Sequence, residues 1–206
     1  TARCAAGATS CRPAPPGARA DGRAQLDASS RLQIRSGRGQ RKVSAFFDTN
    51  ILVYSRDPDD VAKRALARNL IERSIEEESF VVSTQVLVEF YATSMRRRLV
   101  GPAQALELVR FWGGHDTVPH TPDLVTRGIE LHQAHSLSIW GGLIVEAALD
   151  AHCDVLLSED LQHGRRFGSL EVVNPFLPAA AHEAPARSYG PVRPAARSRK
   201  ARKHGL

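Results

Sequence analysis

Two acidic residues stand where apolar segments of the chain end, and a third lies among apolar residues of an expected helix. Asp48 follows the apolar run 43–47, and Asp160 ends the run 154–160. Both runs have the length and composition of short strands that are buried on both faces of a parallel sheet. The carboxyl ends of such strands meet at one edge of the sheet, where ligands bind. We therefore expect Asp48 and Asp160 to lie in one crevice.

Carboxylates that share a crevice repel each other unless a cation lies between them. Asp48 and Asp160 therefore predict a site for a divalent metal ion. Glu89 is a third candidate, because it stands among apolar residues where a solvated carboxylate would be out of place. Asn50 and Ser158 are expected to orient the acids or to cap nearby backbone.

Basic residues near the acids could contact a phosphate of a substrate. Arg165, Arg166 and His163 follow Asp160 in the expected loop, and they are candidates for that role. The arginine run 96–98 is interpreted instead as the solvated end of a helix, where the helix dipole favours positive charge. Trp140 is expected to lie in the core, and stacking on a nucleic-acid base is the less favoured alternative.

The expected elements alternate between strands and helices. Strands are expected at 43–47, 80–82, 117–118, 155–157 and 171–173, and helices at 61–77, 84–100, 102–112, 122–135 and 138–151. This alternation implies parallel strands joined by right-handed helical crossovers. The predicted fold class is therefore α/β, with a central parallel sheet between two layers of helices.

The distribution of charge divides the chain into three parts. Residues 1–41 hold 8 Lys and Arg and 2 acids, residues 42–177 hold 13 and 19, and residues 178–206 hold 7 and 1. The flanks 1–41 and 178–206 are basic, of low complexity and poor in large apolar residues, so both are predicted to be disordered. The domain at 42–177 is acidic, which suits metal binding or a basic partner peptide better than a general DNA-binding surface.

The cysteines and the hydropathy exclude several classes of protein. Cys4, Cys11 and Cys153 lack the spacing of zinc ligands and do not form a disulfide framework. No stretch of the sequence has the length of a membrane span, and no signal-peptide core lies near residue 1. The expected location is therefore the cytoplasm.

Four segments resemble, in order, the signature segments of PIN-domain ribonucleases. They are 47–52 (FDTNIL), 85–90 (QVLVEF), 137–145 (LSIWGGLIV) and 156–164 (LLSEDLQHG). The similarity is greatest to the VapC-like toxins of bacterial toxin–antitoxin pairs. It implies a Rossmann-like PIN fold whose acids hold Mg²⁺ or Mn²⁺ and cleave RNA, in a toxin inhibited by a small antitoxin protein.

The resemblance also assigns the acids individually. Asp48 matches the first acid of the family, Glu89 the second and Asp160 the fourth, whereas Gly141 occupies the position of the third. A missing carboxylate removes a metal ligand and weakens the field that opposes charge on the phosphorus. Later acids of the same helix face other directions, so Glu159, beside Asp160, is the candidate replacement ligand.

Two alternatives to a ribonuclease remain open. A PIN domain that lacks its third acid could have lost catalysis and serve as a module that binds RNA or an antitoxin. A phosphatase or dehalogenase with Asp48 as nucleophile is disfavoured, because such phosphatases need a second aspartate where Asn50 stands. The sequence is also compatible with a homodimer.

Overall fold

Six strands form one sheet in the order β3-β2-β1-β4-β6-β5. The computed structural model describes residues 43–178, so the predicted disorder of 1–41 and of the tail after Pro178 concerns residues outside it. Neighbouring strands are parallel, except that β5 is antiparallel to β6. The strands are β1 Ala45–Phe47, β2 Phe80–Ser83, β3 Asp116–Val118, β4 Val155–Leu157, β5 Arg166–Phe167 and β6 Leu170–Val173.

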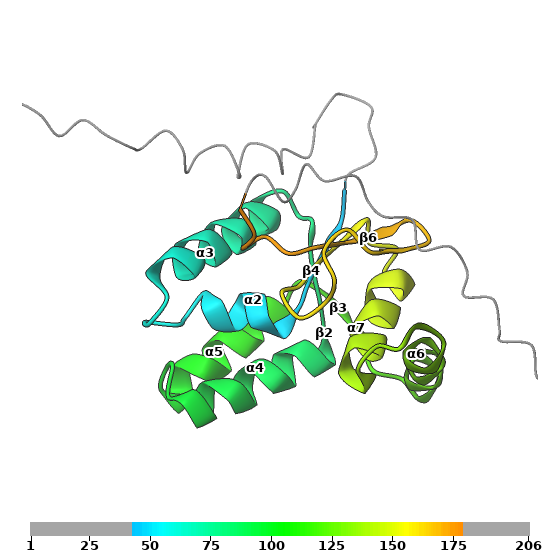
Figure 1. Cartoon of the computed structure of the whole chain (residues 1–206). Coiled ribbons are helices and arrows are strands. Elements are labelled where there is room, and N and C mark those ends of the chain that lie inside the picture. Colours follow the sequence, from blue (N-terminus) through cyan, green and yellow to red (C-terminus); the bar gives the residue numbers. More distant parts are fainter. Residues whose placement is uncertain (1–42, 179–206) are drawn as a thin grey trace, which may run out of the picture. The chain divides into compact units, whose positions relative to one another are not determined.

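Helices cover both faces of this sheet. They are α2 Thr49–Tyr54, α3 Val61–Glu76, α4 Thr84–Arg97, α5 Pro102–Gly113, α6 Pro122–His135 and α7 Ile139–Asp150. Figure 1 shows α3, α4 and α5 on one side of the sheet, and α6 and α7 on the other. The predicted α/β fold with three layers is confirmed.

Side-chain caps fix where the helices around the site begin. Ser83 accepts a hydrogen bond from the amide of Val86 at the start of α4. Thr121 caps α6 in the same way, and Ser138 caps α7 by accepting from the amide of Gly141. Such caps satisfy amides that have no partner within the helix. The predicted starts of these three helices are confirmed.

Aromatic side chains fill the core between the sheet and the α4 and α5 layer. All three residues of β1 are buried, and the ring of Phe47 lies 4.7 Å from that of Phe80. Phe90 of α4 meets Trp112 of α5 edge to face, with 4.8 Å between the ring centroids. The second contact fixes α4, which carries Glu89, against α5.

Two short elements were not predicted from the sequence. α2 has six residues, several of them β-branched, but Asp48 directly before it is a recognisable N-cap. β5 and β6 form a hairpin through Gly168-Ser169, where Gly168 has a φ of +61°. A glycine followed by serine is a known signal for such a turn. β5 therefore adds an antiparallel strand at the edge of the predicted parallel sheet.

Two glycines bring α6 and α7 into close contact. A Cβ atom at Gly142 would lie 2.4 Å from the carbonyl oxygen of Gly128, and one at Gly128 would lie 2.8 Å from the side chain of Leu143. No real side chain fits at the first distance, because the obstacle is backbone. The position of α7, and of the residues at its start, therefore depends on glycine at 142.

We expect Gly142→Ala to destabilise the protein by about 1–3 kcal/mol, the usual cost of overpacking, although alanine favours helix formation. Gly113→Ala in α5 is the matched control, since its Cβ would meet only the end of the Leu87 side chain, at 3.3 Å. Urea unfolding measures both. Equal or greater stability of the Gly142→Ala variant would show that the helices can separate freely.

Candidate active site

Asp48 and Asp160 lie at the point where the connections of the sheet change direction. β1 pairs with β2 on one side and with β4 on the other, and Phe47 is in register with Leu157. Asp48 directly follows β1, and Asp160 follows β4 after two residues. Open α/β sheets bind ligands at this kind of switch point. The structure therefore brings these two acids to one crevice.

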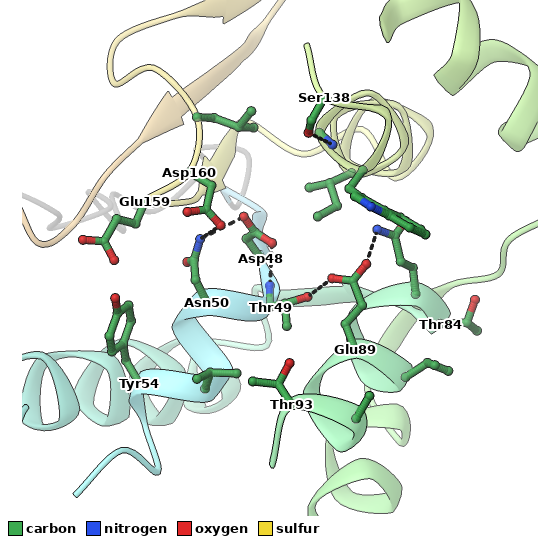
Figure 2. A pocket seen from close by; sticks show the side chains of 18 of the residues that line it. Asp48, Thr49, Asn50, Tyr54, Thr84, Glu89, Thr93, Ser138, Glu159 and Asp160 are labelled. Atoms are coloured by element: carbon green, nitrogen blue, oxygen red, sulfur yellow. Dashed lines mark hydrogen bonds between the residues drawn. The ribbon is translucent and has the colours of Figure 1, made fainter. Parts of the chain in front are cut away.

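The amide of Asn50 bridges the two carboxylates. Its Nδ2 donates to Oδ2 of Asp48 over 3.0 Å and to Oδ2 of Asp160 over 3.2 Å. Asp48 also accepts from the amide of Thr49 and from the hydroxyl of Ser158, over 2.6 Å each. Figure 2 shows Asp48 between Asp160 and Glu89. Asn50 and Ser158 thus hold the acids in place.

Asp48 is an acid in an unfavourable environment. Its side chain is 5% exposed. Burial raises the pKa of its carboxyl to about 7, and the nearby charges of Asp160 and Glu89 act in the same direction. The hydrogen bonds from Ser158 and Thr49 oppose this rise only in part. Within residues 43–178 no basic side chain pairs with Asp48 or Asp160, so a positive charge here would stabilise both.

Glu89 reaches the same crevice from α4 but makes different contacts. Its carboxylate accepts from the hydroxyl of Thr49 over 2.9 Å and from Nε2 of Gln85 over 2.7 Å. Thr49 therefore connects the two acids, because its hydroxyl donates to Glu89 and its amide donates to Asp48. No three acidic, histidine or cysteine side chains of the described residues converge closely enough to hold a metal ion by themselves.

The remaining donors nevertheless fit a magnesium ion. Mg²⁺ is commonly held by one or two carboxylates and keeps water in its other positions. Asp48 and Asp160 supply two carboxylates that face one amide nitrogen, and their negative charge has no counter-ion among residues 43–178. Oδ1 of Asn50 is buried and has no hydrogen-bond partner in the described chain, but it points away from both carboxylates because Nδ2 faces them. These donors suit the metal site predicted from the sequence, with two acids as direct ligands.

A cleft of about 1090 Å³ opens over these acids. Its walls come from α2, one face of α4 along its whole length, the start of α7, the loop after β4 and His120 before α6. Arg96 and Arg97 line it two turns beyond Glu89, so reading the run 96–98 only as a solvated helix end was incomplete. Arg97 pairs with the buried Asp57, whereas Arg96 has no ion pair among residues 43–178.

Glu159 and Gly141 both line the cleft, but neither supplies a carboxylate beside Asp48. Glu159 forms an ion pair with Lys63 of α3, and Figure 2 shows it on the side of Asp160 away from Asp48. At Gly141 a Cβ would lie 3.0 Å from Oγ of Ser138 and 3.1 Å from the end of Leu161. Farther along α7, Glu146 pairs with Arg127, as expected for an acid that faces elsewhere.

The predicted phosphate contacts Arg165, Arg166 and His163 are not among the residues that line the cleft. Arg166 pairs with Glu171, which is in register with the first residue of β4. Arg166 therefore lies near the amino end of β4, whereas Asp160 follows its carboxyl end. Arg165 donates to the carbonyl of His135, over 2.9 Å. His163 accepts from the amide of Asn174. The chain after Asp160 turns back along β6, so these three residues are close to Asp160 in the sequence but lie outside the cleft that contains it.

Several residues of the cleft were not identified from the sequence. Trp140, expected in the core, is 59% exposed and lines the cleft. Gln85 and His120 line it as well, and Oε1 of Gln85 and Nε2 of His120 are buried without a partner in the described chain. Burial lowers the pKa of His120, and the charge of Glu89 opposes this shift. The helical spacing of Gln85, Glu89 and Arg96 was the signal available for these α4 positions.

No helix among residues 43–178 has both the length and the apolar content needed to cross a membrane.

Comparison with solved structures gives distant matches. A toxin–antitoxin complex from Klebsiella pneumoniae is 19% identical, with 65% of this chain and 98% of that chain covered and a TM-score of 0.47. The VapC20 toxin of Mycobacterium tuberculosis, described as cleaving the sarcin–ricin loop, is 18% identical, with coverages of 57% and 92% and a TM-score of 0.47. VapBC2 from Rickettsia felis, bound to a DNA fragment of its promoter, is 16% identical, with coverages of 63% and 97% and a TM-score of 0.48.

Comparison with curated proteins gives no match. The family model of the PIN domain matches residues 45–166, which is more than half of the chain and includes Asp48, Glu89, Gly141 and Asp160. The match agrees with the four segments noted in the sequence and with a mostly parallel sheet between helices. The chain belongs to the PIN domain family.

Proposed function

We propose that this protein is a metal-dependent endoribonuclease whose reaction takes place between Asp48 and Asp160. The observation that carries the proposal is the pair of carboxylates at the switch point of the sheet, bridged by one amide and open to a large cleft. A buried acid whose pKa is raised to about 7 requires a positive charge to stay ionised at neutral pH. A divalent cation supplies that charge.

The residues of the crevice have separable roles in this proposal. Asp48 and Asp160 would hold Mg²⁺ or Mn²⁺, and Asn50 and Ser158 keep the carboxylates oriented. Such an ion lowers the pKa of a water molecule and opposes the negative charge that develops on a phosphate. Glu89, held by Thr49 and Gln85, adds a further carboxylate that can accept a proton from water.

Arg96 replaces Arg165 and Arg166 as the residue proposed to bind a phosphate of the substrate. It lines the cleft, is exposed and has no ion pair in the described chain. It lies seven positions after Glu89, about 10.5 Å along the helix. A phosphate bound by Arg96 would thus belong to a nucleotide beside the one that is cut, because Arg96 lies about two helical turns along α4 from the acid Glu89.

A toxin role, with inhibition by a small antitoxin protein, rests on the four segments that resemble VapC-like toxins. The charge of the domain supports it. Residues 42–177 carry a net charge of −6, and the cleft contains Asp48, Glu89 and Asp160. A partner segment with arginine or lysine would complement those acids.

A second candidate function is supported by Gly141. The residue removes the carboxylate expected from α7, and Glu159 does not replace it because it pairs with Lys63. The domain could then bind RNA or an antitoxin without cutting RNA. The same assay separates the two functions.

We expect the full chain to cut RNA internally with Mg²⁺ or Mn²⁺ and to lose this activity when the metal is removed with EDTA. Asp160→Asn should lower the rate by about 100-fold or more, since a single electrostatic contact at a reacting phosphate often carries that much. Gel analysis of the RNA fragments with time measures the rate.

Glu107→Gln is the control for the loss of one negative charge, because Glu107 is exposed on α5 and does not line the cleft. It should cut like the parent. RNA that is bound but uncut with both metals would reject the enzyme in favour of the binding module.

A further inference from the structure

Trp140 is the largest apolar side chain exposed in the cleft. It is 59% exposed, whereas Trp112, the other tryptophan, is 1% exposed. Tryptophan normally buries most of its surface, so this exposure has a cost in the free protein. No aromatic ring or cation of the described chain stacks on it. The face of the indole is therefore available to a ligand.

The position of Trp140 relates it to the acids. It is the second residue of α7, directly before Gly141, which fills the family position of the third acid. Figure 2 shows the start of α7, marked by Ser138, on the Asp48 side of the crevice, with Glu89 of α4 below it. Val88 of α4 also lines the cleft and is 68% exposed. An apolar surface thus lies within the cleft that holds the acids.

Polar groups of the same cleft lack partners. Nε2 of Gln85 donates to Glu89, so its Oε1 must point the other way. Gln85 is 7% exposed, and this oxygen has no partner among residues 43–178. The cleft also holds the guanidinium of Arg96, which has no ion pair in that part of the chain. Flat apolar surface, hydrogen-bonding groups without partners and one cation without an ion pair together match a nucleotide better than they match an apolar peptide.

We propose that Trp140 is a specificity-determining residue that stacks on an unpaired base of the RNA next to the phosphate that is cut. This inference rests on the proposed ribonuclease function and deepens it. The bases of an RNA duplex are stacked on each other and are out of reach in its deep, narrow major groove, whereas unpaired bases stack readily on aromatic side chains. Trp140 would therefore select segments of RNA whose bases are free.

A ligand in the cleft should change the fluorescence emission of Trp140 and not that of Trp112, because Trp112 is buried away from the solvent. The experiment uses the full chain with Asp48→Asn, so that RNA is bound without being cut. A short unstructured RNA should quench the emission, and the same sequence in a duplex should not. Trp140→Ala should weaken binding of the unstructured RNA about tenfold or more, as stacking of a base usually provides, and Trp140→Phe should retain most of the affinity.

Phe111→Ala is the matched control, since Phe111 is 55% exposed on α5 and does not line the cleft. Its affinity for RNA should equal that of the parent. Unchanged affinity in Trp140→Ala would overturn the inference, as would equal quenching by duplex RNA. Quenching only by an arginine-containing peptide would do so too, and would make the surface a protein docking site.

Failure of this inference and failure of the proposed function give different results. The emission and the affinity are measured without cleavage, so quenching by unpaired RNA supports the role of Trp140 even when the parent cuts no RNA. Conversely, a parent that cuts RNA while Trp140→Ala binds and cuts equally well would keep the enzyme and reject the stacking role.

Discussion

Asp48→Asn is expected to abolish RNA cleavage and, in the absence of metal, to make the protein more stable. The buried carboxylate lies beside Asp160 and Glu89 without a counter-ion in the described chain. Asparagine removes the charge and keeps an oxygen that can accept from the amide of Thr49. The pKa of Asp48 is raised from 3.8 to about 7, and a shift of that size corresponds to about 4 kcal/mol at high pH.

The raised pKa fixes the direction of the pH dependence. Between pH 3.8 and about 7, the unfolded chain has released the Asp48 proton while the folded protein keeps it. The folded protein therefore binds more protons, and its stability falls as the pH rises through this window. Below pH 3.8 Asp48 is neutral in both states and does not lower the stability, and above about pH 7 its buried charge lowers the stability by the full amount. The Asp48→Asn variant should lack this pH-dependent loss of stability.

Urea unfolding of both proteins in EDTA, from acidic to mildly alkaline pH, measures the difference. The variant should gain most over the parent above pH 7. Added Mg²⁺ should stabilise the parent and leave the variant nearly unchanged, because a ligand that binds the folded state stabilises it by mass action. A variant that is less stable than the parent at pH 8 would contradict the environment described for Asp48.

Gly141→Asp is expected to raise the rate of RNA cleavage by about tenfold or more, since one electrostatic contact at the reacting phosphate commonly carries about 10²–10³-fold. Position 141 is the third residue of α7, and its amide already donates to the capping hydroxyl of Ser138. A carboxylate there is also favoured by the helix dipole. The Ser138 and Leu161 side chains would lie 3.0 and 3.1 Å from the new Cβ atom, so they must shift by a few tenths of an ångström.

Gly141→Asn separates charge from shape in this experiment, because asparagine has nearly the same size as aspartate and no charge. It should fold like Gly141→Asp without the gain in rate. Binding of Mn²⁺ should tighten only in the aspartate variant. Equal rates in the parent and in Gly141→Asp, with an active parent, would show that Asp48, Asp160 and water already complete the site and would reject the impaired-enzyme interpretation.

The central part of the fold and the acid pair could be predicted because both follow from local patterns. Short apolar runs that end in an acid define β1 and β4, and parallel strands deliver their ends to one edge. The helices α3 to α7 were predicted to within a few residues, since capping residues and proline mark their starts. The structure brings Asp48 and Asp160 together through the Asn50 amide.

The features that were missed depend on how elements pack. Trp140 continues the apolar stripe of α7, but it lies in the first turn, over the cleft, where no other element covers it among the described residues. Arg166 is close to Asp160 in sequence, yet the β5–β6 hairpin carries it to the opposite sheet edge. The run of three arginines at 96–98 predicted a solvated helix end. The helical register of Arg96 with Glu89 instead decides that Arg96 faces the cleft.

The contrast between the two glycines at the start of α7 bears on how this site can change during evolution. At 142 the neighbouring backbone excludes any side chain, but at 141 only movable side-chain ends lie close. Any glycine codon becomes a codon for aspartate or glutamate through a change of its second base alone. In the proposed ribonuclease, a carboxylate at position 141 is therefore one point mutation away from the present gene. The space at 141 admits that change without disrupting the contact between α6 and α7, which depends on Gly142.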